Sequence, residues 1–191
     1  MNIRKLWFGF IAVMVLSFGV LGYFGIEIYH QAPPIPDKVV TSDGTVLFTG
    51  QDIRDGQNIW QSIGGQELGS VWGHGAYQAP DWTADWLHKE AMAMLDVLSM
   101  EKFSKKFAEI DPADQAFLKI RLQQDIRRNT FSESAKTITV STTRASAIQI
   151  TSTFYSGLFT NNPEMAKLRA NYSIPENSIK TPERMAKMTA F

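Results

Sequence analysis

The sequence contains no cysteine. A c-type haem is attached through two cysteine thioethers and has a histidine imidazole on its iron, so this chain cannot hold a haem in that way. The 19 basic residues balance the 19 acidic ones, and no long run of one charge occurs, so no nucleic-acid-binding surface is predicted. There are only three histidines, and neither an internal repeat nor a low-complexity tract is present.

One long uncharged run lies near the N-terminus. Residues 6–26 (LWFGFIAVMVLSFGVLGYFGI) are 21 uncharged residues, enough at about 1.5 Å per residue to cross a hydrocarbon core of about 30 Å. Basic residues precede the run and acidic residues follow it, which places the N-terminus in the cytoplasm and the rest outside. A cleaved signal peptide is the alternative. Its apolar region is usually about 7–15 residues long, and residues 28–31 are a poor cleavage site, which favours an uncleaved transmembrane anchor.

The rest of the chain is predicted to be mainly α, as one extramembrane domain with a small β-hairpin. Residues 1–30 form the cytoplasmic N-terminus and the anchor, and the prolines in residues 31–37 predict a stiff linker. The domain itself is expected over residues 38–180. Valine-rich segments on either side of Ser42-Asp43-Gly44 predict the hairpin. Capping residues and prolines predict helices over 51–62 and 145–159 and from Asp81, Asp111 and Thr181 onward, with a short strand at 136–140.

The most specific pattern is a glycine-rich stretch between the first two of these helices. Residues 56–77 read GQNIWQSIGGQELGSVWGHGAY, and residues 78–82 continue as QAPDW. This stretch resembles the haem-attachment region of the small cytochrome c subunit of nitric oxide reductases, and the corresponding haem-free N-terminal domain of the quinol-dependent enzymes. In the small subunit, Gly-x-x-Val-Trp-Gln precedes Cys-x-x-Cys-His, and Gly-x-Gly-Gly-Tyr-x-x-Pro-Asp follows. When Trp60 is set on the tryptophan of this pattern, Tyr77 falls on its tyrosine without a gap.

This resemblance implies a cytochrome c-like fold that has lost its haem. The two cysteine positions fall on Gly65 and Leu68 and the haem-ligand position falls on Gly69, none of which can form a thioether or bind iron. An unfilled cavity costs about 24 cal/mol per Å3, so bulky side chains are expected to occupy the vacated volume. The candidates are Trp60, Trp72, Trp82 and Trp86. Stacking of a quinone on these rings is a less favoured alternative, because an extramembrane domain lies away from a lipid-soluble substrate.

The resemblance also implies a calcium role for two loop residues. In the two-subunit relatives, a glycine carbonyl and a tyrosine of the small subunit bind a calcium ion that bridges propionates of the two b-type haems. The ungapped match places these roles on Gly75 and Tyr77, and calcium prefers oxygen ligands. Two ligands do not make a site, so the others are expected from outside this chain. The alternative is that Tyr77 packs its ring on Pro80 and Trp82.

A zinc hydrolase site is a weaker hypothesis. Asp81, Asp85 and His88 lie near one helix start, and His74 is close to them in sequence. No His-x-x-x-His or Glu-x-x-His pairing is present, so helix caps and solvated side chains are the favoured interpretation.

The resemblance implies that the complete enzyme reduces two NO to N2O and water with electrons from quinol, as in denitrification. Its haem b, haem b3 and non-haem iron are held by a catalytic transmembrane region, so this chain alone is expected to be inactive and to carry no catalytic residue. We expect residues 181–191 to begin a helix leading to that region, which makes the chain the front portion of such an enzyme. The alternative is a stand-alone, non-catalytic anchored subunit that docks on a separate large subunit.

The same resemblance predicts the location and the partners. The expected location is the bacterial cytoplasmic membrane, with the domain on the periplasmic side. The expected partners are the catalytic region, in the same or a separate chain, membrane lipid, and quinol in the full enzyme. No nucleic-acid partner is expected.

Overall fold

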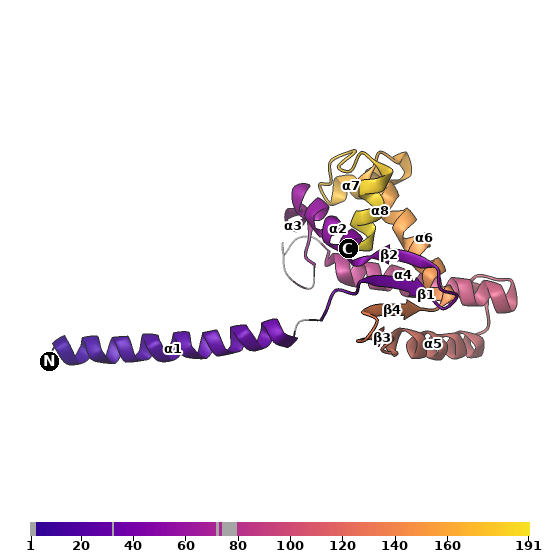
Figure 1. The fold of residues 1–191 in the computed structure, drawn as a ribbon. Coiled ribbons are helices and arrows are strands. Elements are labelled where there is room, and N and C mark those ends of the chain that lie inside the picture. The colour runs from indigo at the N-terminus through magenta and orange to yellow at the C-terminus, as the bar shows by residue number, and fades with distance from the viewer. Residues whose placement is uncertain (1–2, 32, 72, 74–79) are drawn as a thin grey trace. The chain divides into compact units, whose positions relative to one another are not determined.

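The structure is a computed structural model that describes residues 3–31, 33–71, 73 and 80–191. It divides the chain into two compact units, Met1–Ile35 and Pro36–Phe191. Most of the described residues are helical, and a small mixed sheet accompanies the helices of the second unit (Figure 1). The predicted mainly α fold is confirmed.

The first unit consists of α1 (Ile3–Gln31), which is longer than the uncharged run that it contains. It buries no residue, and its apolar side chains are exposed along its whole length. Among the described residues, it is the one helix whose length and composition are sufficient to cross a membrane. A signal sequence would have the same properties, so membrane anchoring by α1 stays a prediction.

The sheet of the second unit has the strand order β2-β1-β4-β3. The expected hairpin is formed by β1 (Lys38–Thr41) and β2 (Val46–Thr49), which pair antiparallel around a turn at Gly44 with a φ of 90°. The other pairings were not predicted. β1 also pairs in parallel with β4 (Thr137–Val140), and β4 pairs antiparallel with β3 (Phe131–Ser132). The parallel pair joins segments about a hundred residues apart, which no local pattern encodes.

The main helices begin where the capping residues predict. They are α2 (Gly50–Ser62), α4 (Trp82–Phe103), α5 (Pro112–Arg127), α6 (Thr142–Phe159) and α8 (Pro182–Ala190), with the shorter α3 (Gly65–Leu68) and α7 (Ala166–Asn171). Thr49 and Asp52 form the predicted capping box of α2. α6 begins before its expected start at 145, because Ser141 follows β4 directly and its side chain accepts a hydrogen bond from the Arg144 amide.

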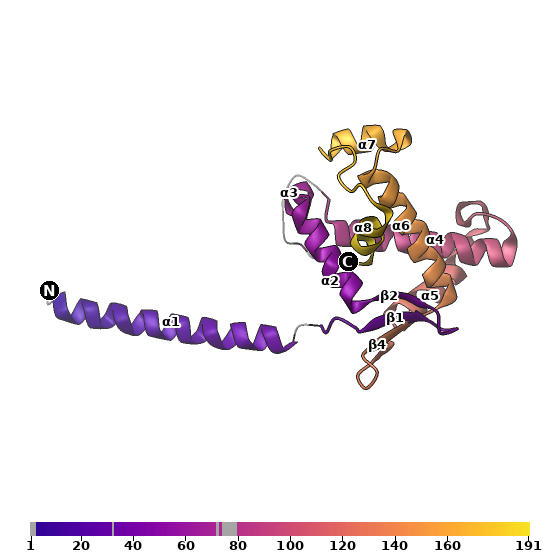
Figure 2. The same cartoon turned by 45° about the horizontal axis from the view of Figure 1, so that its top comes forward.

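Two helices from opposite ends of this unit cross at a glycine. α8 packs against α2 (Figure 2), and a Cβ at Gly56 would overlap the carbonyl oxygen of Lys187 and lie 2.8 Å from the Cβ of Phe191. The Lys187 ammonium donates to Asp55 at 3.0 Å, which raises the pKa of Lys187 and lowers that of Asp55. α8 belongs to the same compact unit as α2, and the expectation that it leads to a catalytic region stays a prediction.

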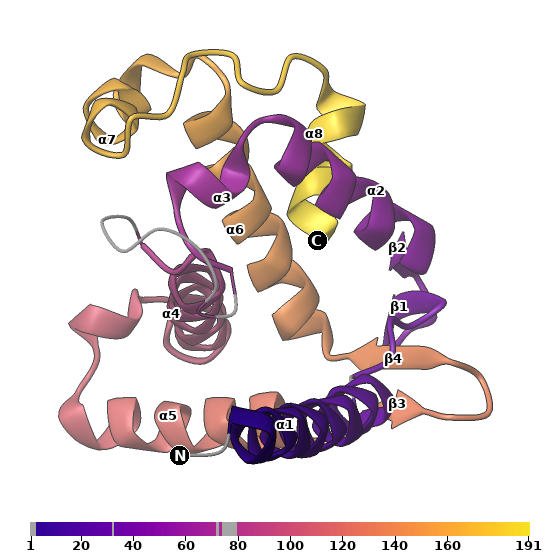
Figure 3. The same cartoon turned by 90° about the vertical axis from the view of Figure 1, so that its left-hand side faces the viewer.

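The largest apolar core lies where α2, α4, α6 and α8 meet. Figure 3 shows α6 passing between α4 and the pair formed by α2 and α8. The buried members of this core are Ile59, Trp60, Trp82, Tyr155, Leu158, Phe159, Ile174, Ile179, Met185 and Met188. A second cluster lies between α4 and α5 and includes Leu95, Leu98 and Leu118. Aromatic side chains are concentrated in the first core, beside the glycines that stand at the haem-attachment positions of the family pattern.

Candidate functional site

α3 carries the two positions at which the family pattern has cysteines, since Gly65 is its first residue and Leu68 its last. Trp60, in the last turn of α2, lays its indole against Gly65. A Cβ on Gly65 would lie 2.6 Å from the Trp60 Nε1 and closer still to the ring carbons, a separation that real Cβ atoms do not show. A side chain at position 65 and the Trp60 indole therefore exclude one another. Leu68 packs against the edge of the same core.

Gly69, the position of the haem-ligand histidine in the family pattern, lies against Trp82. A Cβ on Gly69 would be 2.6 Å from the Pro80 carbonyl oxygen and 2.8 Å from the Trp82 Cδ1, with the indole nitrogen nearer still. The contact is fixed by the backbone, because the Ser70 amide donates to the Pro80 carbonyl at 3.1 Å and the Trp82 amide to the Ser70 carbonyl at 2.7 Å. Position 69 thus has room for hydrogen only.

Asp81 holds this loop onto the start of α4. Its carboxylate accepts hydrogen bonds from the Ser70 hydroxyl at 2.7 Å, the Gly73 amide at 2.6 Å and the Ala84 amide at 2.9 Å. The bond from Ser70 is the largest cause that lowers the pKa of Asp81, followed by the two amides. The carboxylate is therefore the N-cap of α4, and its hydrogen bonds to the loop also hold Gly69 against Trp82.

Trp60 and Trp82 are the centre of a packed group of rings. Their ring centroids are 6.0 Å apart in an edge-to-face arrangement, and each contacts Phe159 at about the same distance. Both are more than nine-tenths buried. The indole N–H of each is buried and has no hydrogen-bond partner among the described residues. The packing of the rings, rather than any polar contact, holds the two indoles on their glycines.

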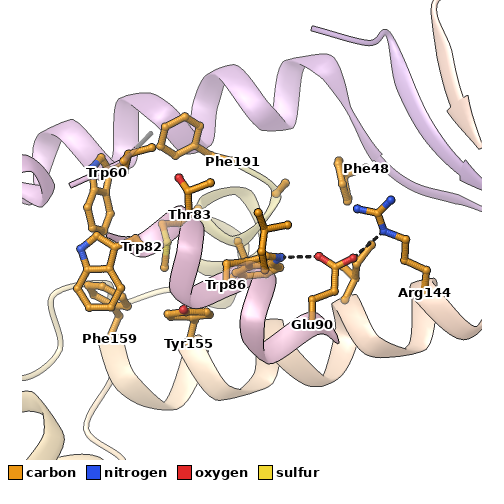
Figure 4. Close-up of a pocket in the computed structure, with 16 residues that line it drawn as sticks. Phe48, Trp60, Trp82, Thr83, Trp86, Glu90, Arg144, Tyr155, Phe159 and Phe191 are labelled. Carbon is orange, nitrogen blue, oxygen red and sulfur yellow. Dashed lines mark hydrogen bonds and ion pairs between the residues drawn. The ribbon is translucent and has the colours of Figure 1, made fainter. Parts of the chain in front are cut away.

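A pocket of about 280 Å3 extends from these rings to an ion pair between Glu90 and Arg144 (Figure 4). Glu90 is 3% exposed, and its two carboxylate oxygens accept from Arg144 Nε at 2.6 Å and from Trp86 Nε1 at 3.0 Å. Trp86 also stacks on Tyr155, with ring centroids 5.2 Å apart. No sequence pattern predicted this pair. Trp86 and Glu90 share a face of α4 at i and i+4, but Arg144 comes from α6, 54 residues further on.

A second polar contact joins α4 to α6. The Tyr155 hydroxyl donates to Asp85 at 2.5 Å, and Asp85 also pairs with Lys89 at 3.3 Å. Burial raises the pKa of Tyr155 well above its ordinary value, and the bond to Asp85 raises it further. Tyr155 therefore stays protonated and acts as a hydrogen-bond donor.

The other predicted site residues meet different outcomes. Gly75 and Tyr77, the calcium candidates, lie outside the described residues with Trp72 and His74, so their roles stay predictions. The zinc hypothesis gains no support. Asp81 caps a helix, Asp85 binds Tyr155, and His88 is exposed. Within the described part of the chain, no group of three or more histidine, aspartate or glutamate side chains is placed to hold a metal ion.

Comparison with known families decides the identity of the second unit. The sequence model of the NorB cytochrome c-like domain family of nitric oxide reductase matches residues 36–191. The chain belongs to this family. A search among curated proteins found no match. The matched range coincides with the second compact unit, so this nitric oxide reductase domain begins at Pro36 and includes α8.

A cytochrome c-like domain implies a c haem, and the residues of this nitric oxide reductase domain do not fit one. No thiol is available for a thioether. At positions 65 and 69, where the resemblance places an attachment cysteine and the ligand histidine, the Trp60 and Trp82 indoles leave space only for glycine. No electron transfer is therefore assigned to a haem in this domain.

Proposed function

We propose that the chain is the membrane anchor and haem-free cytochrome c-like domain of a nitric oxide reductase that reduces two NO to N2O and water with electrons from quinol. The observation that carries this proposal is the family match over residues 36–191. The chemistry would occur at haem b3 and a non-haem iron, fed by haem b, in the catalytic transmembrane region. The described residues of this chain would support and cap that region rather than catalyse.

The proposal also names the source of the electrons, which is quinol and not a soluble cytochrome. A domain with a c haem can take electrons from a soluble cytochrome, whereas Gly65, Leu68 and Gly69 offer no attachment for that haem. The tight contacts of Trp60 and Trp82 at two of these positions support the same conclusion. Electrons would then enter the catalytic region directly from the membrane quinol pool.

Anchoring and orientation complete the proposal. α1 would cross the cytoplasmic membrane, with the N-terminus in the cytoplasm and the domain on the periplasmic side. The length and composition of α1 support the crossing, and Arg4 and Lys5 before the apolar run support the orientation. Gly75 and Tyr77 would supply two oxygen ligands to a calcium ion shared with the catalytic region.

A direct test compares electron donors. Membranes that contain the full-length protein are given NO with either a reduced quinol or a reduced soluble cytochrome c, and NO consumption and N2O formation are measured. The proposal predicts NO turnover with quinol and none above background with the cytochrome. Membranes of a deletion strain should lack the quinol-dependent turnover. Turnover with the cytochrome alone, or no change on deletion, would overturn it.

The second candidate is a separate non-catalytic subunit that docks on a large reductase chain. It shares the fold and the absence of haem attachment, and it differs in the size of the native polypeptide. Immunoblotting of solubilised membranes with an antibody to residues 40–180 separates the two. A band several-fold heavier than 21.5 kDa supports a single-chain reductase, and a band near 21.5 kDa supports the separate subunit.

A further inference from the structure

The pocket beside the buried tryptophans has apolar walls and one polar end. Its walls come from α2, β2, α4, α6 and α8, and Trp60 and Trp82 close one end (Figure 4). Apolar side chains form most of the lining, including Phe48, Trp86, Leu87, Ile148, Met188 and Phe191. The opposite end is formed by Glu90 and Arg144. An apolar cavity with one convergent polar group is the usual form of a small-molecule site.

The Glu90 carboxylate sets the orientation of Arg144. It accepts from the Nε of the guanidinium at 2.6 Å, and its other oxygen is held by Trp86. The two terminal nitrogens of Arg144 have no hydrogen-bond partner within the described ranges, and the side chain is 26% exposed. A guanidinium is planar, so fixing its Nε edge also fixes the direction of its terminal N–H groups. The pocket therefore carries an oriented donor pair.

The charge of this end determines which ligands it accepts. Glu90 already neutralises Arg144, and Glu90 is almost fully buried. An anionic ligand on the terminal nitrogens would bring a second negative charge close to the buried carboxylate, where water screens it poorly. A neutral acceptor oxygen would gain the hydrogen bonds of the guanidinium without that repulsion.

We propose that this pocket binds a small neutral molecule with an apolar, preferably aromatic, body and a carbonyl oxygen that accepts from Arg144. Its volume of about 280 Å3 lies just below the usual range of ligand pockets, which suits a single substituted ring or a short acyl chain. Aromatic walls favour a flat ring, since it can lie edge-to-face or stacked on Trp86. The proposal does not depend on NO reduction.

Binding can be measured on the full-length protein in detergent by fluorine NMR. The probes are 4-fluoroacetophenone, a neutral ketone, and 4-fluorobenzoate, which has the same ring and a negative charge. Saturable line broadening reports binding, and its dependence on protein concentration gives the Kd. We expect the ketone to bind at least tenfold more tightly than the benzoate.

Two variants of α6 provide a matched test of the location. Ile148→Phe adds volume inside the pocket, whereas Ile150→Phe adds the same volume on the exposed face of the same helix. We expect the first to abolish saturable ketone binding and the second to leave the Kd unchanged. Equal Kd values for both variants, or no saturable binding to the wild type, would overturn the proposal.

A third variant tests the hydrogen bond. Arg144→Lys keeps the charge opposite Glu90 and removes the planar guanidinium, so the ketone should bind about fivefold to tenfold more weakly. Thermal unfolding checks that each variant is folded. A benzoate Kd equal to or below that of the ketone would contradict the charge argument.

Two kinds of molecule carry this chemistry, a quinone ring and the ester of a short acyl chain. Competition of the bound ketone by duroquinone or by methyl hexanoate separates them, and displacement by either supports the proposal. Displacement by neither would overturn it as a site for natural molecules of this class. Because these readouts involve no NO, their failure leaves the proposed reductase function untouched.

Discussion

At one end of the aromatic pocket, Trp60 and Trp82 lie on Gly65 and Gly69 with space for nothing larger than hydrogen. At the other end, Glu90 and Arg144 face a cavity of about 280 Å3. Both ends include residues of α4 and α6, and the closed end also uses Trp60 of α2 and Gly65 of α3. The closed end depends on ring packing and leaves two indole N–H groups without partners among the described residues. The open end pairs Glu90 with Arg144 and leaves the terminal guanidinium nitrogens for a ligand in the pocket.

The difference shows how a cytochrome c-like domain can persist without its cofactor. A vacated haem volume would cost stability in proportion to its size. In this chain the Trp82 and Trp60 indoles lie against the positions of the iron ligand and of one thioether in the family pattern. In this packing, the Trp60 and Trp82 indoles require glycine at positions 65 and 69. The open end is not required for this closure, which leaves it available for another role.

The largest expected effect comes from opening the closed end. Trp82→Ala should lower the free energy of unfolding by about 3–5 kcal/mol, because it removes a buried ring and leaves a cavity between Tyr155 and Phe159. Thermal unfolding followed by circular dichroism measures the loss. Trp7→Ala on α1, whose side chain is exposed, is the control and should leave the unfolding midpoint of the domain unchanged. Equal effects of the two changes would refute the assigned packing.

Removing the charge at the open end should have the next largest effect. Arg144→Gln leaves the Glu90 carboxylate buried without its cation, at an expected cost of about 2–3 kcal/mol. Glu90→Gln should cost less, because the Arg144 left behind is partly exposed to water. Urea unfolding measures the loss in free energy of unfolding for each variant. A smaller loss for Arg144→Gln than for Glu90→Gln would contradict the burial argument.

A single added methyl group separates the closed end from an ordinary glycine position. Gly65→Ala should cost about 1–3 kcal/mol by forcing the Trp60 indole away. Gly157→Ala, within α6, is the matched control. Its Cβ would lie 3.2 Å from the end of the flexible Asn162 side chain and 3.6 Å from the Met165 Cγ, an ordinary contact. Alanine also favours the helix, so stability should be unchanged or slightly higher. If Gly65→Ala and Gly157→Ala shifted the thermal midpoint equally, position 65 would be no tighter than an ordinary helix glycine.

The smallest expected effect is the pH dependence that Asp81 contributes to the closed end. Its folded-state pKa lies below its ordinary value of about 3.8, so its stabilising contribution is complete above that pH and is lost as the pH falls through the folded pKa. Asp81→Asn should be less stable than the wild type at pH 7, and the gap should narrow below about pH 4. Thermal midpoints of both proteins at pH 7 and below about pH 4 test this. A stability difference that does not change with pH would contradict a stabilising role of the ionised Asp81 carboxylate.

Local signals in the sequence predicted most of the helices. Thr49, Asp81, Asp111 and Thr181 cap the helices that they were expected to start, because a cap depends only on residues two or three positions away. The parallel pairing of β1 with β4 was missed, since it brings together segments that share no local pattern. The prediction of the hairpin was therefore correct, whereas the prediction of the sheet was incomplete.

For the candidate site too, the sequence located individual positions but not the contacts between distant segments. The family pattern located Gly65 and Gly69, but their contacts with Trp60 and Trp82 depend on how α2 and α4 are placed around the loop. The pairing of Glu90 with Arg144 joins two helices, and neither residue belongs to a motif. The roles of Gly75 and Tyr77 remain predictions from the family pattern.

The most direct test of the central claim is a double-mutant cycle between Gly69 and Trp82. Gly69→Ala is introduced into the wild type and into Trp82→Ala, and the free energy of unfolding is measured for all four proteins. The account predicts a cost of at least about 1–3 kcal/mol in the wild type and a clearly smaller cost once the indole is gone, when only the clash with the Pro80 carbonyl oxygen remains. An equal cost in both backgrounds would contradict the claim that tryptophan occupies the position of the haem ligand.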